Sequence, residues 1–412
     1  MTGVADDPRV DALDLTEAIA ILQARPTPAA DLAEVAADVG LHSIDIVAWR
    51  DLDDPEAGGS ELHAAMVAER WAAAGLDVSI RTSAAGRLAA HVRRDGYQVV
   101  RKGGRHALFP RVALRGAFRR RPEADGLVEI WNGMPFFSPL WSSAPRVVFL
   151  HHVHDEMWPM TLHPRPLAWL GRAIELRVAP PVYRRSRVVT LSASSRAEII
   201  DILGFPEQNV TVVPPGVDHR FRPGGRRSAA PMVLAVGRLA PVKRFPLLID
   251  ALVELRQRVP DLHAVIAGDG NDRAALVAQI RGNDAEAWLH LPGHVTDTEL
   301  VGLYRRAWIV ASASAREGWG MTLTEAAACG TAAVATRIAG HADAVAHGRS
   351  GLLVDVADLA DAMHRVLADD RLRARMSAAA LLRAADYTWD RTAYGTLAAL
   401  VREAEKPRRP VG

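Results

Sequence analysis

Short apolar runs rich in valine and isoleucine alternate along most of this chain with longer stretches of helical periodicity. In the first half, runs with the length of buried strands lie at 44–49, 78–82, 127–131, 147–150, 188–191 and 210–213. In the second half they recur at 232–236, 264–267, 288–291, 308–311, 332–336 and 352–354. Helical stretches fall between them, notably over 61–74 and 167–183. Apolar strands joined by helical crossovers are typical of a mostly parallel sheet covered on both faces, so the pattern predicts an α/β protein.

A glycine- and proline-rich segment separates the two series of predicted strands. Residues 214–230 contain three Pro and three Gly and show no periodicity. The predicted organisation is an N-terminal helical extension (1–43), a Rossmann-like domain (44–215), a linker (216–230), a second Rossmann-like domain (231–385) and a C-terminal helix (386–412) that packs back on the first domain. Ligands bind doubly wound sheets at the carboxyl ends of the strands. We therefore expect two facing domains with the site in a cleft between them.

Composition excludes several classes of protein. The chain has 412 residues, enough for two domains, and is 49% hydrophobic and 24% charged, which is ordinary for a globular protein. Its 50 basic and 48 acidic residues give a net charge of +2, so no global charge points to nucleic acid. One cysteine excludes a disulfide framework and a cysteine-built zinc site. The acidic start does not resemble a signal peptide, and the apolar region 127–150 is interrupted by Glu129, Asn132 and three prolines. We expect a cytoplasmic protein.

The segment Glu317–Gly330, EGWGMTLTEAAACG, holds two carboxylates at the start of a predicted helix. Thr322 and Glu325 have the spacing of a capping box, so one interpretation of Glu325 is structural. In the other interpretation, the free amides at the helix start face a phosphate, and Glu317 and Glu325 reach hydroxyl groups on either side of it. Both interpretations stay open at this point.

A second segment, LAVGRLAPVKRFPLL over 234–248, places two cations after a predicted strand. Arg238 and Lys243 follow Gly237 on a loop at the carboxyl end of that strand. Two cations at this position suit a diphosphate, whose charge must be neutralised when it departs as a leaving group. The alternative is that both are solvated loop charges.

Together these two segments resemble glycosyltransferase family 4, the retaining enzymes with two facing Rossmann-like domains known as the GT-B architecture. Glu317 and Glu325 match the family's E-x7-E signature, and Gly237, Arg238, Leu239 and Lys243 match its G-R-L-x(3)-K element. The resemblance implies that Glu317 holds sugar hydroxyls, Glu325 the ribose, and Arg238 with Lys243 the diphosphate. It extends the expected donor-binding set to Gly318, Trp319, Gly320, Met321, Thr322 and Leu323, and to His294 and Val295 near the base.

The resemblance also selects candidates in the first domain. Gly58 and Gly59 lie in a glycine-rich turn between the first predicted strand and its helix, as in the family. The family places a histidine that faces the sugar after a later strand, and His151 and His152 are the alternatives here, since successive side chains alternate in direction. The cluster His151, His152, His154, Asp155 and Glu156 is also a candidate metal site. We expect no metal, because the family neutralises diphosphate with Arg and Lys.

The chain departs from the family pattern at two positions. Arg244 follows Lys243 where the family usually has glycine, and Trp319 stands where it often has phenylalanine. Neither change removes a charged partner of the donor. The tryptophan is expected to reshape the sugar pocket.

A basic stretch, Arg101–Arg121, contains eight cations, no acid and interleaved leucine, valine and phenylalanine. It is interpreted either as a solvated surface, as a grip on a phosphorylated acceptor, or as a peripheral contact with an anionic membrane, at its inner face for a cytoplasmic protein. The sequence does not distinguish these.

The sequence therefore predicts a retaining transferase that moves a hexose-type sugar from a UDP-, GDP- or ADP-sugar to a glycan, lipid or small-molecule acceptor. No cofactor and no nucleic-acid partner are expected. Two alternatives remain: a sugar-nucleotide epimerase or hydrolase of the same fold, and a non-catalytic sugar-nucleotide-binding subunit.

Overall fold

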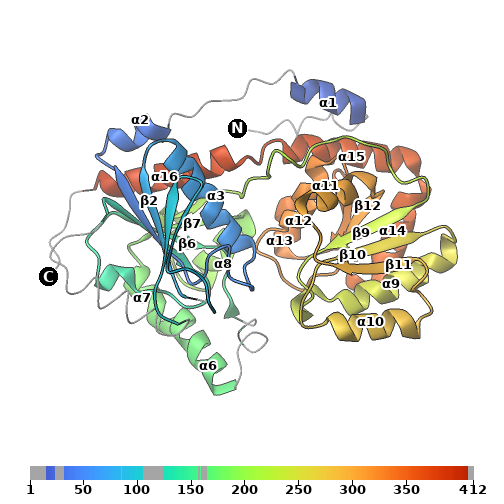
Figure 1. The fold of residues 1–412 in the computed structure, drawn as a ribbon, viewed down its shortest axis with the longest axis horizontal. Helices are drawn as coiled ribbons and strands as arrows, with labels where there is room; N and C mark the ends of the chain where they lie inside the picture. Colours follow the sequence, from blue (N-terminus) through green and yellow to red (C-terminus); the bar gives the residue numbers. More distant parts are fainter. Residues whose placement is uncertain are drawn as a thin grey trace. The chain divides into compact units, whose positions relative to one another are not determined.

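The computed structural model describes residues 15–23, 32–84, 86–104, 124–155, 158 and 165–406. Its internal contacts divide the chain into two compact units. Unit 1 comprises Met1–Thr27 and Val217–Thr388, and unit 2 comprises Pro28–Gly216 and Trp389–Gly412. Each unit holds one predominantly parallel sheet with helices around it (Figure 1). Both are the α/β domains that the alternating pattern predicts, and every apolar run predicted as a strand forms one.

Unit 1 contains a six-stranded parallel sheet in the order β11-β10-β9-β12-β13-β14. Its strands are β9 (Met232–Val236), β10 (His263–Ala267), β11 (Leu289–Gly293), β12 (Ile309–Ser312), β13 (Ala332–Thr336) and β14 (Gly351–Val354). Strand order reverses between β9 and β12, since the chain first builds outward to β11 and then returns to the other side of β9. Doubly wound sheets bind ligands at such a switch point, beside the carboxyl ends of the two strands.

The helices of unit 1 form two groups that cover the sheet (Figure 1). One group comprises α9 (Phe245–Arg258), α10 (Arg273–Gly282) and α14 (Leu359–Ala368). The other comprises α11 (Asp297–Arg306), α12 (Met321–Ala328), α13 (Ala339–Ala344) and α15 (Asp370–Ala384). Leu248 from α9, Ile266 from β10, Val334 from β13 and Met363 from α14 are fully buried in the core between them.

Unit 2 contains an eight-stranded sheet in the order β3-β4-β2-β1-β5-β6-β7-β8. Its strands are β1 (Ser43–Val47), β2 (Asp77–Thr82), β3 (His91–Arg94), β4 (Tyr97–Arg101), β5 (Gly126–Trp131), β6 (Arg146–Leu150), β7 (Arg187–Thr190) and β8 (Val210–Val212). Only the β3–β4 pair is antiparallel. This hairpin was not predicted, although Asp95-Gly96, both with positive φ, is a typical two-residue hairpin turn.

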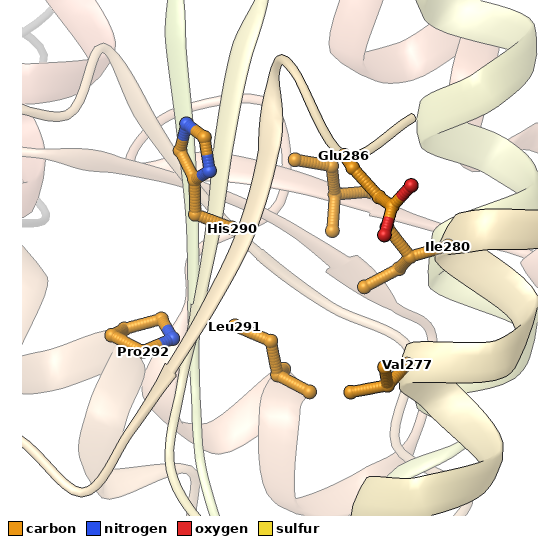
Figure 2. A pocket seen from close by; sticks show the side chains of 7 residues that line it. Val277, Ile280, Glu286, His290, Leu291 and Pro292 are labelled. Atoms are coloured by element: carbon orange, nitrogen blue, oxygen red, sulfur yellow. The ribbon is translucent and has the colours of Figure 1, made fainter. Parts of the chain in front are cut away.

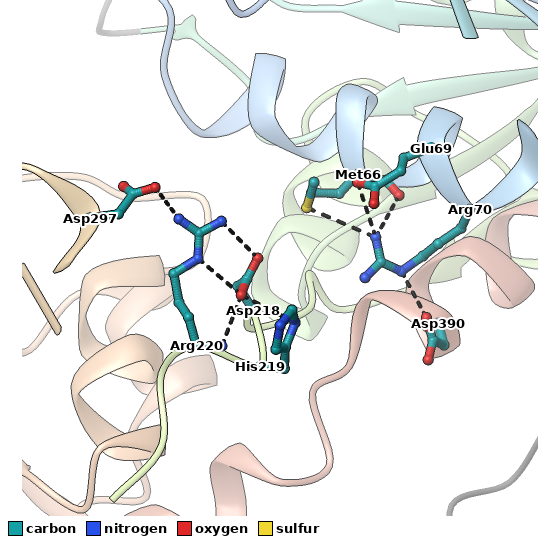
Figure 3. Close-up of polar contacts among 8 residues, drawn as sticks. All are labelled: Met66, Glu69, Arg70, Asp218, His219, Arg220, Asp297 and Asp390. Atoms are coloured by element: carbon teal, nitrogen blue, oxygen red, sulfur yellow. Dashed lines mark hydrogen bonds and ion pairs between the residues drawn. The ribbon is translucent and has the colours of Figure 1, made fainter. Parts of the chain in front are cut away.

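The helices of unit 2 include one that comes from the end of the chain. They are α2 (Leu32–Ala37), α3 (Gly59–Ala73), α6 (Arg165–Ala173), α7 (Ala179–Tyr183), α8 (Ala193–Asp201) and α16 (Trp389–Ala404). The Trp71 indole of α3 donates to the Ala393 carbonyl of α16 at 3.1 Å, and Arg70 pairs with Asp390 at 2.7 Å (Figure 3). Leu397 is fully buried in the core of this unit.

The residues predicted as one N-terminal extension belong to two units. Helix α1 (Leu15–Gln23) packs on α15 of unit 1, where Leu15 and Ile19 lie against an apolar cluster that includes the buried Leu382. Helix α2 and strand β1 belong to unit 2. Among the described helices, none combines the length and apolarity that a bilayer span requires.

Candidate functional site

The first candidate site lies at the switch point of unit 1, where the loops after β9 and β12 meet. The Ala315 amide donates to the Val242 carbonyl at 2.8 Å, which ties the two loops together. Beside this bond, Lys243 Nζ donates to Glu317 Oε1 at 2.5 Å. Two residues 74 positions apart in the chain therefore form one ion pair, because the sheet brings the two strand ends together.

Glu317 is held as a carboxylate in partly buried surroundings. Ser314 Oγ donates to the same oxygen, Oε1, at 2.7 Å. Burial by itself would raise the pKa of Glu317, but the Lys243 ammonium and the Ser314 hydroxyl outweigh it and hold the pKa below its ordinary value. Both of these contacts engage Oε1, and a carboxylate offers two oxygens to donors.

A buried histidine supports the Glu317 loop from the far side. His341 on α13 is 1% exposed, and its Nδ1 lies 2.8 Å from the Thr336 carbonyl. A carbonyl only accepts, so Nδ1 carries the proton and Nε2 faces Ser312 Oγ at 3.4 Å. Ser312 contacts Ser314 at 3.2 Å, which completes a polar chain to Glu317. Burial lowers the pKa of His341, so the ring is neutral near pH 7.

Backbone packing also fixes the position of Glu317. A Cβ added at Gly340 would lie 2.2 Å from the Glu317 carbonyl oxygen, closer than real Cβ atoms approach. Only glycine lets α13 come this near to the loop. None of the residues that support Glu317 was predicted from the sequence: Ser312, Ser314, Thr336, Gly340 and His341.

Glu325, the second carboxylate, does not cap its helix. Helix α12 begins at Met321 with Gly320 as its N-cap and no side-chain cap, so the capping-box interpretation of Thr322 and Glu325 is wrong. Glu325 instead accepts a hydrogen bond from the Tyr304 hydroxyl of α11 at 2.8 Å. Burial raises the pKa of Glu325 to about 7, a shift that the Tyr304 bond opposes only in part.

Charged residues from two further segments act on Glu325. Arg220 lies between Asp218, at 3.0 Å, and Asp297 at the start of α11 (Figure 3). The Arg220 guanidinium lowers the pKa of Glu325, and both aspartates raise it. This region therefore offers a carboxylate close to its titration point next to a fixed cation.

The residues expected at the second diphosphate contact and at the base lie on the loops after β9 and β11. Arg238 is exposed on the loop after β9, and His294 is exposed and Val295 half-buried directly after β11. Arg244 has a positive φ of 51° and is the N-cap of α9, a conformation that glycine adopts more readily. This explains physically why glycine suits that position.

The residues around the start of α12 differ in how far they are buried. Gly318, Met321 and Thr322 are half-buried, whereas Gly320 and Leu323 are buried. Trp319 is 4% exposed and packs edge-on against Tyr387 with ring centroids 5.0 Å apart. Its indole is therefore a core contact of unit 1. The ring is not exposed, so the structure does not show it lining a pocket.

In unit 2, a carboxylate on α3 accepts from the glycine-rich turn at the start of that helix. Gly58 is the N-cap of α3 and Gly59 its first residue. The Gly58 amide donates to Glu61 Oε2 at 2.8 Å, and Ser60 Oγ donates to the same oxygen at 2.9 Å. Arg50 contacts the other oxygen of Glu61 at 3.3 Å. The turn is thus fixed by a buried carboxylate on its own helix.

The two candidate histidines have different environments. His151, 6% exposed, lies with its Nε2 3.0 Å from Nδ1 of His63, a buried residue of α3. Burial lowers the pKa of His151 to about 4, and burial and His151 hold the pKa of His63 well below its ordinary value. His152 is half-buried and stacks on His154 at 4.6 Å.

The metal interpretation of this cluster has no support in the described part of the chain. Within those residues, no three His, Cys, Asp or Glu side chains gather as a metal site would require. His151 pairs with His63, and Asp155 pairs with Arg172 at 2.6 Å. Glu156 lies outside the described residues.

The basic stretch Arg101–Arg121 is not one continuous surface. Arg101 is 2% exposed and forms a two-pronged ion pair with Asp51 at 2.7 and 2.8 Å, with Asp53 beside it. Its inclusion in a solvated or membrane-binding stretch is wrong, because the buried Asp51 and the half-buried Asp53 hold it inside unit 2. Lys102 is exposed, and residues 105–121 lie outside the described residues.

One pocket of about 360 Å³ lies apart from these residues (Figure 2). It is formed by α10 and the edge strand β11, with Val277, Ile280, Glu286, Leu289, His290, Leu291 and Pro292 around it. None of the candidate donor residues lines it.

Both halves of the chain match family models. A model described as Glycosyltransferase Family 4 matches residues 57–221, and one described as Glycosyl transferases group 1 matches residues 218–383. A D-inositol 3-phosphate glycosyltransferase of Pseudarthrobacter chlorophenolicus is 37% identical over 52% of this chain and 54% of its own length. The chain thus spans little more than half of that relative. A glycogen synthase of Mycobacterium tuberculosis is 30% identical over 66% of this chain and 69% of its own length.

Solved structures share the fold at low sequence identity. Sucrose-phosphate synthase from Thermosynechococcus elongatus has a TM-score of 0.70 at 17% identity, covering 86% of this chain and 97% of that one. Anabaena HepE, solved in complex with UDP-glucose, has a TM-score of 0.68 at 20% identity and covers 86% and 98%. With the E-x7-E pair placed at the switch point of a GT-B fold and both halves matched, this chain belongs to glycosyltransferase family 4.

Proposed function

We propose that this chain is a retaining glycosyltransferase that moves a hexose-type sugar from a nucleotide-diphosphate sugar to an acceptor hydroxyl. The observation that carries the proposal is the Lys243–Glu317 pair at the switch point of unit 1. A cation and a carboxylate side by side suit adjacent parts of one donor, the phosphates and the sugar. The family to which the chain belongs supports the same reaction class.

The proposed donor contacts follow from this arrangement. Since Lys243 and Ser314 engage Oε1 of Glu317, we assign Oε2 to the sugar hydroxyls. Lys243 and the exposed Arg238 are assigned to the diphosphate, and the backbone amides at the start of α12 add partial positive charge there. Glu325 is assigned to the ribose hydroxyls and His294 with Val295 to the base.

In the proposed chemistry, the bond between the anomeric carbon and the diphosphate oxygen breaks as the acceptor oxygen attacks from the same face. The acceptor proton passes to the departing phosphate oxygen, so no protein carboxylate forms a covalent intermediate. Lys243 and Arg238 stabilise the charge that develops on the diphosphate. These cations are assigned the task that a metal ion performs in other transferases, so turnover should persist in EDTA.

The nucleotide and the acceptor follow most directly from the relatives' names. UDP-glucose, the ligand named for the HepE structure, is the first donor to test. Relatives are named as D-inositol 3-phosphate glycosyltransferases and as a glycogen synthase. A phosphorylated cyclic polyol and an α-glucan are therefore the first acceptors, with a lipid acceptor as the third class.

The experiment is a donor-turnover assay with UDP-, GDP- and ADP-glucose, each with and without these acceptors. We expect one nucleotide to be released much faster with one acceptor class, and an α-linked product by NMR. Turnover without any acceptor, giving free sugar or an epimer, would identify the hydrolase or epimerase alternative. Tight nucleotide binding without turnover would identify a non-catalytic subunit.

A further inference from the structure

A continuous helical segment of unit 2 carries large apolar side chains on its outside. Helix α6 runs into a π-helical turn (Ile174–Val178) and then into α7 without a break. Figure 1 shows α6 projecting from the sheet of its unit. We call Arg165–Arg185 the α6–α7 segment.

The exposed apolar residues of this segment recur at helical spacing. Leu167 is 48% exposed, Trp169 65%, Leu170 55% and Val178 51%. Leu167, Leu170 and Val178 fall on one stripe with the half-buried Ile174. Four of the eight large hydrophobic residues that are exposed in the described part of the chain lie here. Such a concentration marks an interaction surface rather than ordinary scatter.

The exposed charges of the α6–α7 segment all have one sign. Its exposed charged residues are Arg165, Arg177, Arg184 and Arg185. Its one acidic residue, Glu175, is fully buried and accepts from the His154 and Asp155 amides and from the Trp158 indole. The surface of the segment therefore combines apolar side chains with arginine and presents no carboxylate.

The opposite side of the segment is fixed to the unit. A Cβ added at Gly171 would lie 2.5 Å from the Trp158 ring, so α6 and this indole pack as closely as glycine permits. Ala168 is buried beside it on the same face. Because the inner face is packed in this way, the outer stripe is preformed, and its Leu167, Leu170 and Val178 side chains stay exposed.

We propose that the α6–α7 segment docks unit 2 onto an anionic phospholipid surface. Helices that lie in a bilayer interface expose Trp and Leu together with Lys or Arg. The α6–α7 segment exposes the leucines of its stripe, the arginines and, next to the stripe, Trp169, whose ring lies against the Arg172 guanidinium at 5.8 Å. Trp169 suits the headgroup level, where its ring is partly apolar and its N–H reaches a polar partner. A second copy of the chain fits less well, since a symmetric contact would gather the arginines of both copies in one interface to which the segment contributes no exposed carboxylate.

This surface differs from the basic stretch considered from the sequence, because it uses other residues. It also uses none of the residues that the proposed function assigns to the donor, since those residues belong to unit 1. Binding to lipid and turnover of a soluble donor are therefore separately measurable.

The experiment is cosedimentation of the full chain with vesicles of phosphatidylcholine alone or mixed equally with phosphatidylglycerol. We expect binding to the mixed vesicles, none to the neutral ones, and loss of binding as salt rises from about 0.1 M to about 1 M. The W169S/L170S variant should bind at least about tenfold more weakly, and R177S/R184S/R185S should lose the preference for anionic lipid. Matched controls are Ile202→Ser, which removes another exposed apolar residue of unit 2, and Arg93→Ser, which removes an exposed arginine of β3.

Three results would overturn the proposal. The first is absence of wild-type binding to anionic vesicles, and the second is unchanged binding by W169S/L170S, which would assign the contact to another segment. The third is a wild-type dimer in light scattering that W169S/L170S dissolves, which would make the stripe a self-association face. If W169S/L170S unfolds at a lower temperature than the wild type, a second measurement tests the proposal. Brominated lipid should quench the tryptophan fluorescence of the wild type more strongly than that of Trp169→Phe.

Discussion

At the residue scale, Lys243 and Glu317 neutralise each other across two loops, and each also has a proposed partner in the donor. Replacing Lys243 by Ala should lower kcat/KM. The loss should correspond to roughly 2–4 kcal/mol of transition-state stabilisation, which is typical when one preorganised charge is removed. The substitution also leaves Glu317 without its cation, so the pKa of that carboxyl should rise. Steady-state kinetics with the best donor measure the effect, and Lys102→Ala, which removes an exposed lysine, is the control. Wild-type kinetics in Lys243→Ala would refute the assignment, and the same expectation holds for Arg238→Ala.

Glu325 poses a separate question, because its raised pKa of about 7 is a stability statement as well as a functional one. The folded pKa lies above the ordinary value, so the stabilisation belongs to the protonated form and is lost as pH rises from about 4.5 to about 7. Glu325→Gln removes this loss. Without donor, the variant should be more stable than the wild type at pH 8, by on the order of 1–3 kcal/mol in free energy of unfolding, and should therefore melt at a higher temperature. At pH 5 the two melting temperatures should be close.

The same substitution should weaken the donor. If Glu325 accepts from two ribose hydroxyls, the amide accepts at only one atom, and affinity should fall about tenfold or more. In wild type, ribose binding favours the carboxylate, so affinity for UDP-glucose should rise with pH through about 7, with release of a proton. Calorimetry in two buffers of different ionisation enthalpy measures both. Equal affinity in Glu325→Gln would leave only the Tyr304 contact as a role.

At the element scale, helix α9 begins on a strained residue. Arg244 occupies the left-handed region and provides no side-chain cap. Glycine adopts this conformation without a Cβ penalty and is a better N-cap than long side chains. Arg244→Gly should therefore stabilise the fold by roughly 0.5–1 kcal/mol in thermal unfolding. Arg226→Gly is the comparison at an exposed residue with no such φ. A lower melting temperature would show that the Arg244 side chain contributes more than its backbone costs.

The contact between α3 and the end of β6 makes unit 2 sensitive to acid. His63 and His151 are neutral in the fold, because both rings are buried. The pKa of His63 lies well below its ordinary value, and that of His151 is about 4. A depressed pKa gives stability that is present above about 6.5 and is lost as pH falls towards the folded value, by roughly 1.4 kcal/mol per unit and per histidine. His63→Gln should flatten the dependence of the melting temperature between pH 7.5 and pH 5. His91→Gln, at an exposed strand residue, should leave the dependence unchanged. An equal slope in all three proteins would place the acid sensitivity elsewhere.

At the scale of the whole molecule, the chain crosses between its units more than once, and each unit has its own core. Leu397 on α16 is fully buried in unit 2, and Leu382 on α15 is fully buried in unit 1. Leu397→Ala should cost about 2–5 kcal/mol of stability while leaving UDP-glucose affinity within twofold, because the proposed nucleotide contacts belong to unit 1. Leu382→Ala is the matched control in the other unit and should lower both the stability and the affinity for UDP-glucose. Calorimetric unfolding with and without donor tests this, and a large loss of affinity in Leu397→Ala would contradict it.

The sequence by itself determined the α/β class, the two strand series and the residue types of the proposed donor loops. These features are local: apolar runs of strand length, a glycine–cation loop and two carboxylates eight positions apart are visible without knowing what packs against them. Asp95-Gly96 is also a local signal for the β3–β4 hairpin. The hairpin was nevertheless not predicted, because the strands on either side of this turn are polar and rich in arginine. The N-terminal helices were readable as helices, but their placement was not, because that depends on which distant apolar face each one covers.

Only the tertiary structure decided which side chains meet. Glu325 has the spacing of a cap, yet the helix starts two residues too early for Thr322 to be the N-cap, and Tyr304 from another helix becomes the partner of Glu325. The sequence places Arg101 in a basic stretch, but its side chain is buried against Asp51, 50 positions earlier in the chain. His63 and Gly340 carry no signal in the sequence, since their importance comes from contacts with His151 and with the backbone of Glu317. Sequence patterns record the periodicity and chemistry of a segment, whereas burial, ion pairing and close backbone approach depend on residues that folding brings from elsewhere in the chain.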